Sequence, residues 1–168
     1  MSALTQKRLK ELLSYDPENG RFTRLVLRGR PAAHGCAAGY TASKGYQMIG
    51  VDGRRYMAHR LAWLYTTGEW PLNYIDHING RKGDNRIANL REATNAENHQ
   101  NVWAPRVDSL SSGLRGVCFY KRDQSWQAQI VVRGKQKYLG RYTTKEQAHQ
   151  AYLAAKYELH PFSRAAML

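Results

Sequence analysis

Residues 74–98, "YIDHINGRKGDNRIANLREATNAEN", contain the pattern that decides the fold of the first half of the chain. Short apolar runs at 73–76 and 88–94 flank a polar loop rich in asparagine and glycine, which predicts two short strands joined by that loop. Thr94 and Glu97 have the spacing of a capping box, in which each side chain accepts a hydrogen bond from the other residue's backbone N–H. The pattern therefore predicts two strands followed at once by a helix.

The segments before this stretch carry equally local signals. Asp52-Gly53 is typical of the two-residue turn of a β-hairpin. Gly68 and Pro71 end a compact apolar segment that has the spacing of a helix. We predict a helix at 4–13, a strand at 21–27, a hairpin at 45–59 and a helix at 58–65.

The pattern changes in the last third of the chain. Residues 102–111 lack periodicity and contain proline and serine, which predicts a linker. Three strand-like runs follow the linker, and a helix is expected after them. Thr144 and Gln147 open this helix, and it ends before Pro161. The strands are expected at 113–123, 125–134 and 135–144.

The predicted fold class is therefore α+β. An N-terminal region at 1–101 contains the two strands and helix of the opening stretch, with the decisive motif at 56–101. A second domain at 112–161 is expected to be a three-stranded antiparallel sheet packed on one helix.

The chain is strongly basic. Its 168 residues include 26 Lys+Arg and 13 Asp+Glu, which gives a formal net charge of +13 and a pI near 10. An excess of this size repels itself unless an anionic partner neutralises it, so nucleic acid is the leading partner class. Two alternatives stay open on charge alone: a basic protein that is merely soluble, and one that binds acidic membrane surfaces.

The sequence also restricts the compartment and the metal chemistry. It has no run of 18 apolar residues, and Lys7, Arg8 and Lys10 interrupt the first apolar positions, so neither a membrane span nor a secretory signal is expected. Cys36 and Cys118 are far apart, and two cysteines cannot form a thiolate zinc cluster. We expect a protein of a reducing cytoplasm, in which any metal ligand is an oxygen or an imidazole.

Asp76 and His77 offer the groups that metal-assisted phosphodiester cleavage requires. That chemistry needs a hard divalent cation on the scissile phosphate and a base that activates water. Carboxylate and amide oxygens suit Mg²⁺, and a neutral imidazole suits proton abstraction near neutral pH. Adjacent residues of a strand point to opposite sides, so Asp76 can hold a metal while His77 faces water. Asn98, on the following helix, can supply a second oxygen.

The series "DHINGRKGDNRIANLREATNAENHQN" resembles the HNH endonuclease family, in the subgroup common in phage and intron-encoded enzymes. The upstream "YMAHRLAWLYTTGEWP" also resembles that subgroup, and the match spans roughly 38–101. The resemblance implies a ββα-metal domain that holds one divalent cation, Mg²⁺ or Mn²⁺, with His77 as general base and Asp76 and Asn98 as metal ligands. Asn89 is expected to bond across the loop and orient His77.

Two departures from the family bear on the ligands. Many members have a histidine at the helix position, so His99 is the alternative to Asn98. Many also carry structural zinc on paired cysteines that this chain lacks, so no structural zinc is expected.

Several basic residues near the motif are candidate phosphate contacts. His59 starts an apolar helix and is either such a contact or a partly buried histidine with a backbone partner. The sequence does not decide which arginine stabilises the transition state. The expected DNA-contacting residues of this region are His59, Arg60, Arg81, Lys82 and Arg86.

The last third combines basic and aromatic residues. Residues 115–145 include eight basic residues and one acidic residue, Asp123, with tyrosines and a tryptophan between them. A small sheet with one basic face can lie in the major groove, whereas the alternative is a sheet whose exposed face is simply charged. Trp126 and Ile130 are expected to face the helix.

Residues 112–161 resemble the AP2 DNA-binding domain, on the motifs "RGV", "W-x-A-x-I", "Y-L-G-x-Y-x-T-x-E-x-A" and "A-Y". Positions where plant relatives carry arginine differ here, so no target sequence is carried over. The positions that match DNA contacts of that family are Arg115, Tyr120, Gln129, Gln136, Tyr138, Arg141 and Tyr152.

The sequence therefore predicts a homing-type phage endonuclease that nicks double-stranded DNA near a site held by the AP2-like domain. We expect a monomer or weak dimer in the cytoplasm of a bacterium or phage-infected host. The alternative is a non-catalytic DNA-binding regulator built on an HNH scaffold. An RNA-binding protein is disfavoured because no RNA-recognition module is visible.

Overall fold

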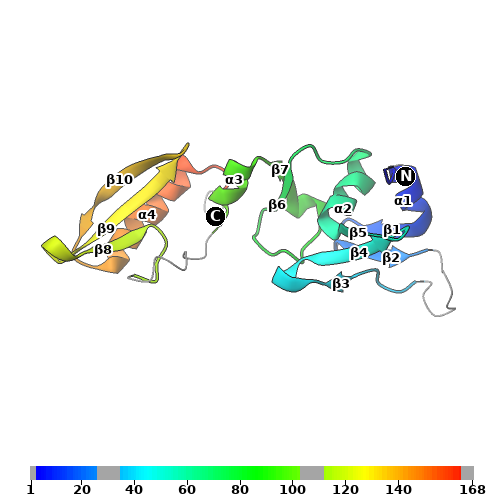
Figure 1. Ribbon diagram of the computed structural model, residues 1–168, viewed down its shortest axis with the longest axis horizontal. Helices are drawn as coiled ribbons and strands as arrows, with labels where there is room; N and C mark the ends of the chain where they lie inside the picture. Colours follow the sequence, from blue (N-terminus) through cyan, green and yellow to red (C-terminus); the bar gives the residue numbers. More distant parts are fainter. Residues whose placement is uncertain (1–2, 26–34, 103–111, 164–168) are drawn as a thin grey trace. The chain divides into compact units, whose positions relative to one another are not determined.

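The computed structural model describes residues 3–25, 35–102 and 112–163. The chain divides into two compact units, Met1–Thr94 and Asn95–Leu168, each of which combines helices with small antiparallel sheets (Figure 1). The predicted α+β class is confirmed. None of the helices in these described parts is long and apolar enough to cross a membrane.

The first unit begins with a helix and a hairpin. Helix α1, Gln6–Leu12, is capped by Thr5, whose side chain accepts a hydrogen bond from the Arg8 backbone N–H. Strands β1, Leu13–Asp16, and β2, Arg21–Arg24, then pair antiparallel. The predicted strand at 21–27 is confirmed as far as Arg24, and its last two residues lie outside the described part of the chain.

A second antiparallel sheet and helix α2 follow. The strands of this sheet are β3, Tyr40–Thr41, β4, Gln47–Val51, and β5, Arg54–Met57. The short 3₁₀ turn η2, Ser43–Gly45, precedes β4. Asp52 and Gly53 have φ values of 46° and 79°, which is the backbone of the predicted two-residue hairpin turn. Helix α2, Ala58–Thr67, ends at Gly68 in the left-handed conformation, so both predictions are confirmed.

The opening stretch forms the expected hairpin. Strand β6, Tyr74–His77, pairs with β7, Leu90–Ala93, so that His77 lies opposite Leu90. Between them lies a polar loop, residues 78–89, which ends in the 3₁₀ turn η3, Ile87–Asn89, and is called the Asn loop below. Helix α3, Asn95–Gln100, begins directly after Thr94, as predicted.

One hydrophobic core joins the elements of the first unit. Leu9 and Leu13 from the N-terminus pack in the same buried cluster as Leu61 of α2 and Leu90 of β7. The rings of Tyr15, Phe22 and Tyr65 also contact one another. The N-terminal helix and hairpin are therefore part of the body that holds β6 and β7.

The second unit contains the predicted sheet and helix. Its strands are β8, Val117–Tyr120, β9, Ser125–Val132, and β10, Lys135–Tyr142, in the order β10-β9-β8 (Figure 1). The 3₁₀ turn η4, Lys121–Asp123, joins the first two strands. Helix α4, Lys145–Leu159, covers one face of the sheet, and Thr144 caps it by accepting from the Gln147 backbone N–H.

The core of the second unit lies between the sheet and α4. Val117, Ala128 and Ala148 are its buried members, and Trp126 packs against them while remaining half-buried. Ile130 is also buried, so both residues expected to face the helix do so. Gly116 has a φ of 78°, and a Cβ there would overlap the ring of Tyr152, which explains the need for glycine in "RGV".

The division between the units differs from the predicted boundary after residue 101. Helix α3 belongs to the second unit. Gln100 Oε1 accepts a hydrogen bond of 3.2 Å from the Phe162 backbone N–H, and the Val102 carbonyl accepts one of 3.1 Å from Lys156 Nζ. These contacts between residues distant in sequence attach 95–102 to the end of α4, and no local pattern predicts them. The rest of the predicted linker, 103–111, lies outside the described residues.

Candidate active site

Asp76 is buried on β6 and is paired across the hairpin. The register places it opposite Arg91 on β7, whose Nη2 and Nε donate to Asp76 Oδ2 at 2.8 and 3.1 Å. A buried carboxylate is costly unless a cation and hydrogen bonds compensate it, and this guanidinium supplies both. Any cation bound at Asp76 therefore shares the carboxylate with Arg91.

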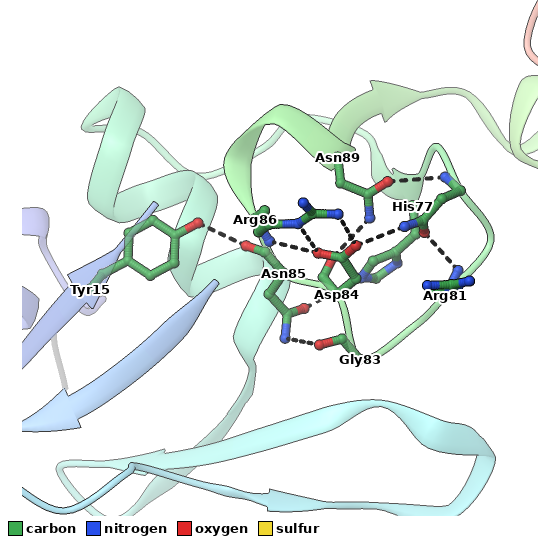
Figure 2. Close-up of polar contacts among 9 residues, drawn as sticks. Tyr15, His77, Arg81, Gly83, Asp84, Asn85, Arg86 and Asn89 are labelled. Atoms are coloured by element: carbon green, nitrogen blue, oxygen red, sulfur yellow. Dashed lines mark hydrogen bonds and ion pairs between the residues drawn. The ribbon is translucent and has the colours of Figure 1, made fainter. Parts of the chain in front are cut away.

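His77 is the neighbouring side chain and is only 4% exposed. Its Nε2 lies 3.3 Å from Asn85 Oδ1 in the Asn loop (Figure 2). Its ring meets that of His59 edge to face at 5.0 Å, and that of Tyr46 at 6.1 Å. Burial lowers the pKa of His77, although the Asn85 hydrogen bond acts in the opposite direction. His77 is therefore an unprotonated imidazole at neutral pH, which is the form that accepts a proton.

The Asn89 side chain joins two backbone segments of the Asn loop by hydrogen bonds. Its Oδ1 accepts a hydrogen bond of 3.0 Å from the Asn79 backbone N–H, and its Nδ2 donates to the Asp84 carbonyl at 2.8 Å (Figure 2). The side chain thus spans the loop, as the sequence predicted, and both of its polar atoms bond to loop backbone. An influence of Asn89 on His77 would pass through the loop.

Asp84 and Arg86 form an ion pair inside the Asn loop. Arg86 Nη2 and Nε donate to the two carboxylate oxygens of Asp84 at 2.6 and 2.8 Å (Figure 2). These hydrogen bonds lower the pKa of Asp84 to about 2. Arg86, expected as a phosphate contact, is therefore paired within the loop although its side chain is exposed, and Arg81 and Lys82 are also exposed on the loop. Lys82 Nζ lies 4.9 Å from the centre of the Tyr46 ring.

His59 lies in the core rather than on the surface. Its Nδ1 is buried without a hydrogen-bond partner, and its ring packs against Tyr46 and His77. Burial, followed by the effect of His77, lowers its pKa to about 3, so it carries no charge for a phosphate. The expected phosphate contact is corrected to a buried packing position. The alternative interpretation, a buried histidine, describes it better, but Nδ1 lacks the backbone partner expected there.

Arg60 is also engaged within the protein. Its guanidinium donates to the carbonyls of Pro71 and Asn73 at 3.4 Å, and it lies 5.9 Å from the Trp70 ring. These contacts fix the segment between α2 and β6. Of the five residues expected to contact DNA in this region, the structure leaves Arg81, Lys82 and Arg86 exposed on the Asn loop, with Arg86 paired to Asp84.

The chemistry of the donor set suits a hard divalent cation. Asp76 offers a carboxylate, and the expected second ligand, Asn98, would add an amide oxygen, which is the ligand type of Mg²⁺ or Mn²⁺ rather than of zinc. Among the residues that the structure describes, no group of three or more His, Cys, Asp or Glu side chains is gathered for a metal. Asn98 is half-buried and His99 exposed on α3, which belongs to the second unit, so the second ligand stays a prediction.

Five of the expected DNA-contacting residues of the second unit share one face of its sheet. This face, which we call the open face, points away from α4. Strand register places Tyr138 beside Gln129, and Arg141 beside Gln127. Gln136 donates to Gln129, and the Arg141 guanidinium lies 4.5 Å from the Tyr120 ring while pairing with Asp123. The open face consists of Cys118, Tyr120, Gln127, Gln129, Val131, Gln136, Tyr138 and Arg141.

The open face is less basic than the sequence predicted. Lys135 and Lys137 lie opposite Val132 and Ile130, and Ile130 faces the helix, so the register places both lysines on the other side. Arg141 is the basic residue that the open face keeps, among amides and aromatic rings. The predicted basic face is therefore corrected to a polar, aromatic one with a single arginine among the residues that form it.

Arg115 and Tyr152 lie apart from the open face. Tyr152 is on α4 and only 5% exposed, packed under Gly116 and stacked on His149. Burial raises the pKa of Tyr152, while Arg115 lowers it through its charge and a hydrogen bond. The pair is thus part of the packing between the helix and the turn before β8, and its expected DNA contact stays a prediction.

Asn85 is the site residue that the sequence did not single out. Its position among several Asn and Asp residues marked it only as a loop former. The contact with His77 depends on the path of the Asn loop, and that path depends on the N-terminal hairpin, 70 residues away in sequence. The density of asparagine in the loop was the sole local signal.

Comparison with known proteins agrees with this geometry. Residues 56–100, which run from the end of β5 into α3, match the HNH endonuclease family. The chain is also similar to Protein 3.8 of Escherichia phage T7, with 35% identity over 94 residues that cover 55% of this chain and 74% of that protein. The chain belongs to the HNH endonuclease family. No solved structure matches it.

Proposed function

We propose that the chain is a metal-dependent DNA endonuclease that hydrolyses one phosphodiester bond per binding event, with His77 as general base. The observation that carries the proposal is a buried His77, whose pKa burial lowers, next to the Arg91-paired Asp76, within the region that matches the HNH family. HNH family membership makes nuclease activity the expected chemistry, and this pair supplies its residues.

The role of each side chain follows from its environment. His77 accepts the proton of the attacking water, because an imidazole with a lowered pKa keeps its lone pair at neutral pH. Asp76 and Asn98 hold the divalent cation, with His99 as the alternative to Asn98. When bound, the cation stabilises the charge that develops on the phosphate oxygens. Asn89 keeps the Asn loop closed around His77.

Double-stranded DNA is the proposed substrate, held by two surfaces. Arg81 and Lys82 are exposed on the Asn loop near the site and offer phosphate contacts. The open face of the second unit offers Arg141, amides and aromatic rings, and it is the surface that we propose holds DNA as an AP2-like domain would. We further propose a homing-type phage enzyme that nicks DNA near the site it holds, acts as a monomer or weak dimer, and works in the cytoplasm of the host.

The test is cleavage of supercoiled plasmid by the full chain. We expect nicked circles with Mg²⁺ or Mn²⁺ and none with EDTA, and we expect His77→Ala and Asp76→Ala to remove the nicking. His149→Ala, at a histidine of the second unit outside the proposed machinery, is the matched control and should nick like wild type. Wild-type protein that binds DNA but never nicks it would favour the non-catalytic regulator instead.

A further inference from the structure

We propose that Asn85 is a positioning residue that sets the tautomer of His77, and that the N-terminal β1–β2 hairpin holds Asn85 in place. The kinetic part of this inference rests on the proposed nuclease function, whereas the tautomer itself is a property of the folded chain. The contacts involved are all within the first unit, and Figure 2 shows Tyr15, Gly83, Asn85 and His77 among them.

The Asn85 amide has a defined orientation. Its Nδ2 donates to the Gly83 carbonyl at 3.3 Å, and an amide turned the other way would place two acceptor oxygens against each other. Asn85 Oδ1 therefore faces His77 Nε2, at 3.3 Å. An acceptor at that position requires a hydrogen on Nε2, and in a neutral imidazole this leaves the lone pair on Nδ1. Nδ1 is then the basic nitrogen.

Burial makes this hydrogen bond decisive for the tautomer. Asn85 is 3% exposed and His77 4%, so water competes little for either group. In such surroundings an acceptor left without a donor is costly, which favours the tautomer that satisfies Asn85. The same bond fixes the rotation of the ring, so the basic nitrogen points in one direction.

Tyr15 holds Asn85 from the N-terminal hairpin. Its hydroxyl donates to the Asn85 carbonyl at 2.7 Å (Figure 2). Burial raises the pKa of Tyr15 to about 12, so the hydroxyl keeps its proton and remains a donor at neutral pH. The ring is held in turn by Phe22 and Tyr65, with centroids at 4.7 and 5.6 Å.

Gly20 provides the second contact of the hairpin. It has a φ of 72° in the β1–β2 turn, and a Cβ there would lie only 2.6 Å from the Asn85 backbone carbon. The turn thus lies directly against the backbone of the Asn loop. Tyr15 and Gly20 thus both contact the peptide group that follows Asn85, and the Asn85 side chain in turn contacts His77.

The first experiment reads the tautomer without metal or DNA. Full-length protein labelled with ¹⁵N-histidine is examined by long-range ¹H–¹⁵N NMR above the ordinary histidine pKa of about 6.5. We expect His77 of wild type to be the Nε2–H tautomer. Asn85→Leu, similar in size but without an acceptor, should shift it to a mixture with Nδ1–H, and Asn85→Asp should keep Nε2–H. Should Asn85→Leu fail to fold, Asn85→Ala carries the same test.

The second experiment reads the nicking kinetics. Asn85→Leu should lower kcat by about 10- to 100-fold at unchanged KM, the range for residues that orient a neighbouring active group, while Asn85→Asp recovers most of it. Tyr15→Phe should lower kcat several-fold, and Tyr65→Phe, in the same ring cluster, is its matched control and should not.

The outcomes separate this inference from the nuclease proposal. An Asn85→Leu variant that keeps pure Nε2–H, or an Asn85→Asp variant that loses it, overturns the role of Asn85 whatever the activity. Equal rates for Tyr15→Phe and Tyr65→Phe overturn the role of the hairpin. A wild-type protein without nicking activity removes the proposed function, and the NMR result alone then decides the inference.

Discussion

The candidate active site and the open face use polar residues in opposite ways. In the first unit His59, Asp76, His77, Asn85 and Asn89 are all buried, and hydrogen bonds or ring contacts fix them. In the second unit the polar residues of the open face remain at the surface of the sheet, and few bonds join them. Burial orients groups for chemistry, whereas exposure leaves them available to a large partner. Substitutions in the two regions should therefore change different quantities.

The largest expected effect follows loss of the base. His77→Ala should lower the single-turnover nicking rate by about 100- to 10,000-fold, the range for general base catalysis, while the DNA dissociation constant changes little. Quench-flow measurement of the rate and a gel-shift titration check the two parts. A comparable loss of affinity would show that His77 mainly supports binding.

Breaking the buried ion pair between Arg91 and Asp76 should destabilise the first unit. Arg91→Met leaves the Asp76 carboxylate buried without its cation, which should lower the free energy of unfolding by about 3 to 5 kcal/mol. Arg8→Met, which removes the exposed pairs of Arg8 with Asp52 and Glu11, is the control and should lower the free energy of unfolding far less, because exposed ion pairs are screened by water. Urea unfolding of both variants measures the difference, and equal costs would contradict the account.

The buried histidines predict a pH dependence of stability. The pKa of His59 falls from 6.5 to about 3 on folding, so below about pH 6 the unfolded chain binds a proton that the folded chain does not. Stability is therefore lost as the pH falls towards 3, by roughly 1 kcal/mol per pH unit for this residue. Urea unfolding between about pH 7 and 4 should show a shallower slope in His59→Phe than in wild type. Equal slopes would contradict a neutral, buried His59.

The smallest expected effect is on the open face. Arg141→Ala should weaken DNA binding and reduce the slope of log K against log salt by about one, while the nicking rate of bound DNA stays unchanged. Lys135→Ala, at a lysine that the register places on the other side of the sheet, is the matched control. A stronger effect of Lys135→Ala than of Arg141→Ala would show that DNA does not bind the open face, and would contradict the proposal.

The sequence predicted the features that depend on neighbouring residues and missed those that depend on contacts between distant elements. The Asp52-Gly53 turn, the end of α2 at Gly68 and the start of α4 after Thr144 depend on neighbouring residues, and all three were correct. The packing of His59 on His77 and the contact of Asn85 with His77 depend on how separate elements meet in the core. Such contacts have no local signature, so the sequence could not decide between the two interpretations of His59.

The second unit shows the same limit. Alternation along the strands correctly predicted that Ile130 faces the helix. It could not show that Lys135 and Lys137 lie on the opposite side from Arg141, because the register is interrupted between Tyr138 and Gly140. If strict alternation is assumed across such an irregularity, the residues beyond it are assigned to the wrong face of the sheet.

The central claim is that the two regions divide chemistry from binding, and one paired measurement tests it most directly. The single-turnover nicking rate and the DNA dissociation constant are measured on the same duplex for wild type, His77→Ala and Arg141→Ala. The account predicts that His77→Ala loses the rate and keeps the affinity, while Arg141→Ala loses affinity and keeps the rate at saturating protein. Two variants that change the same quantity would contradict it.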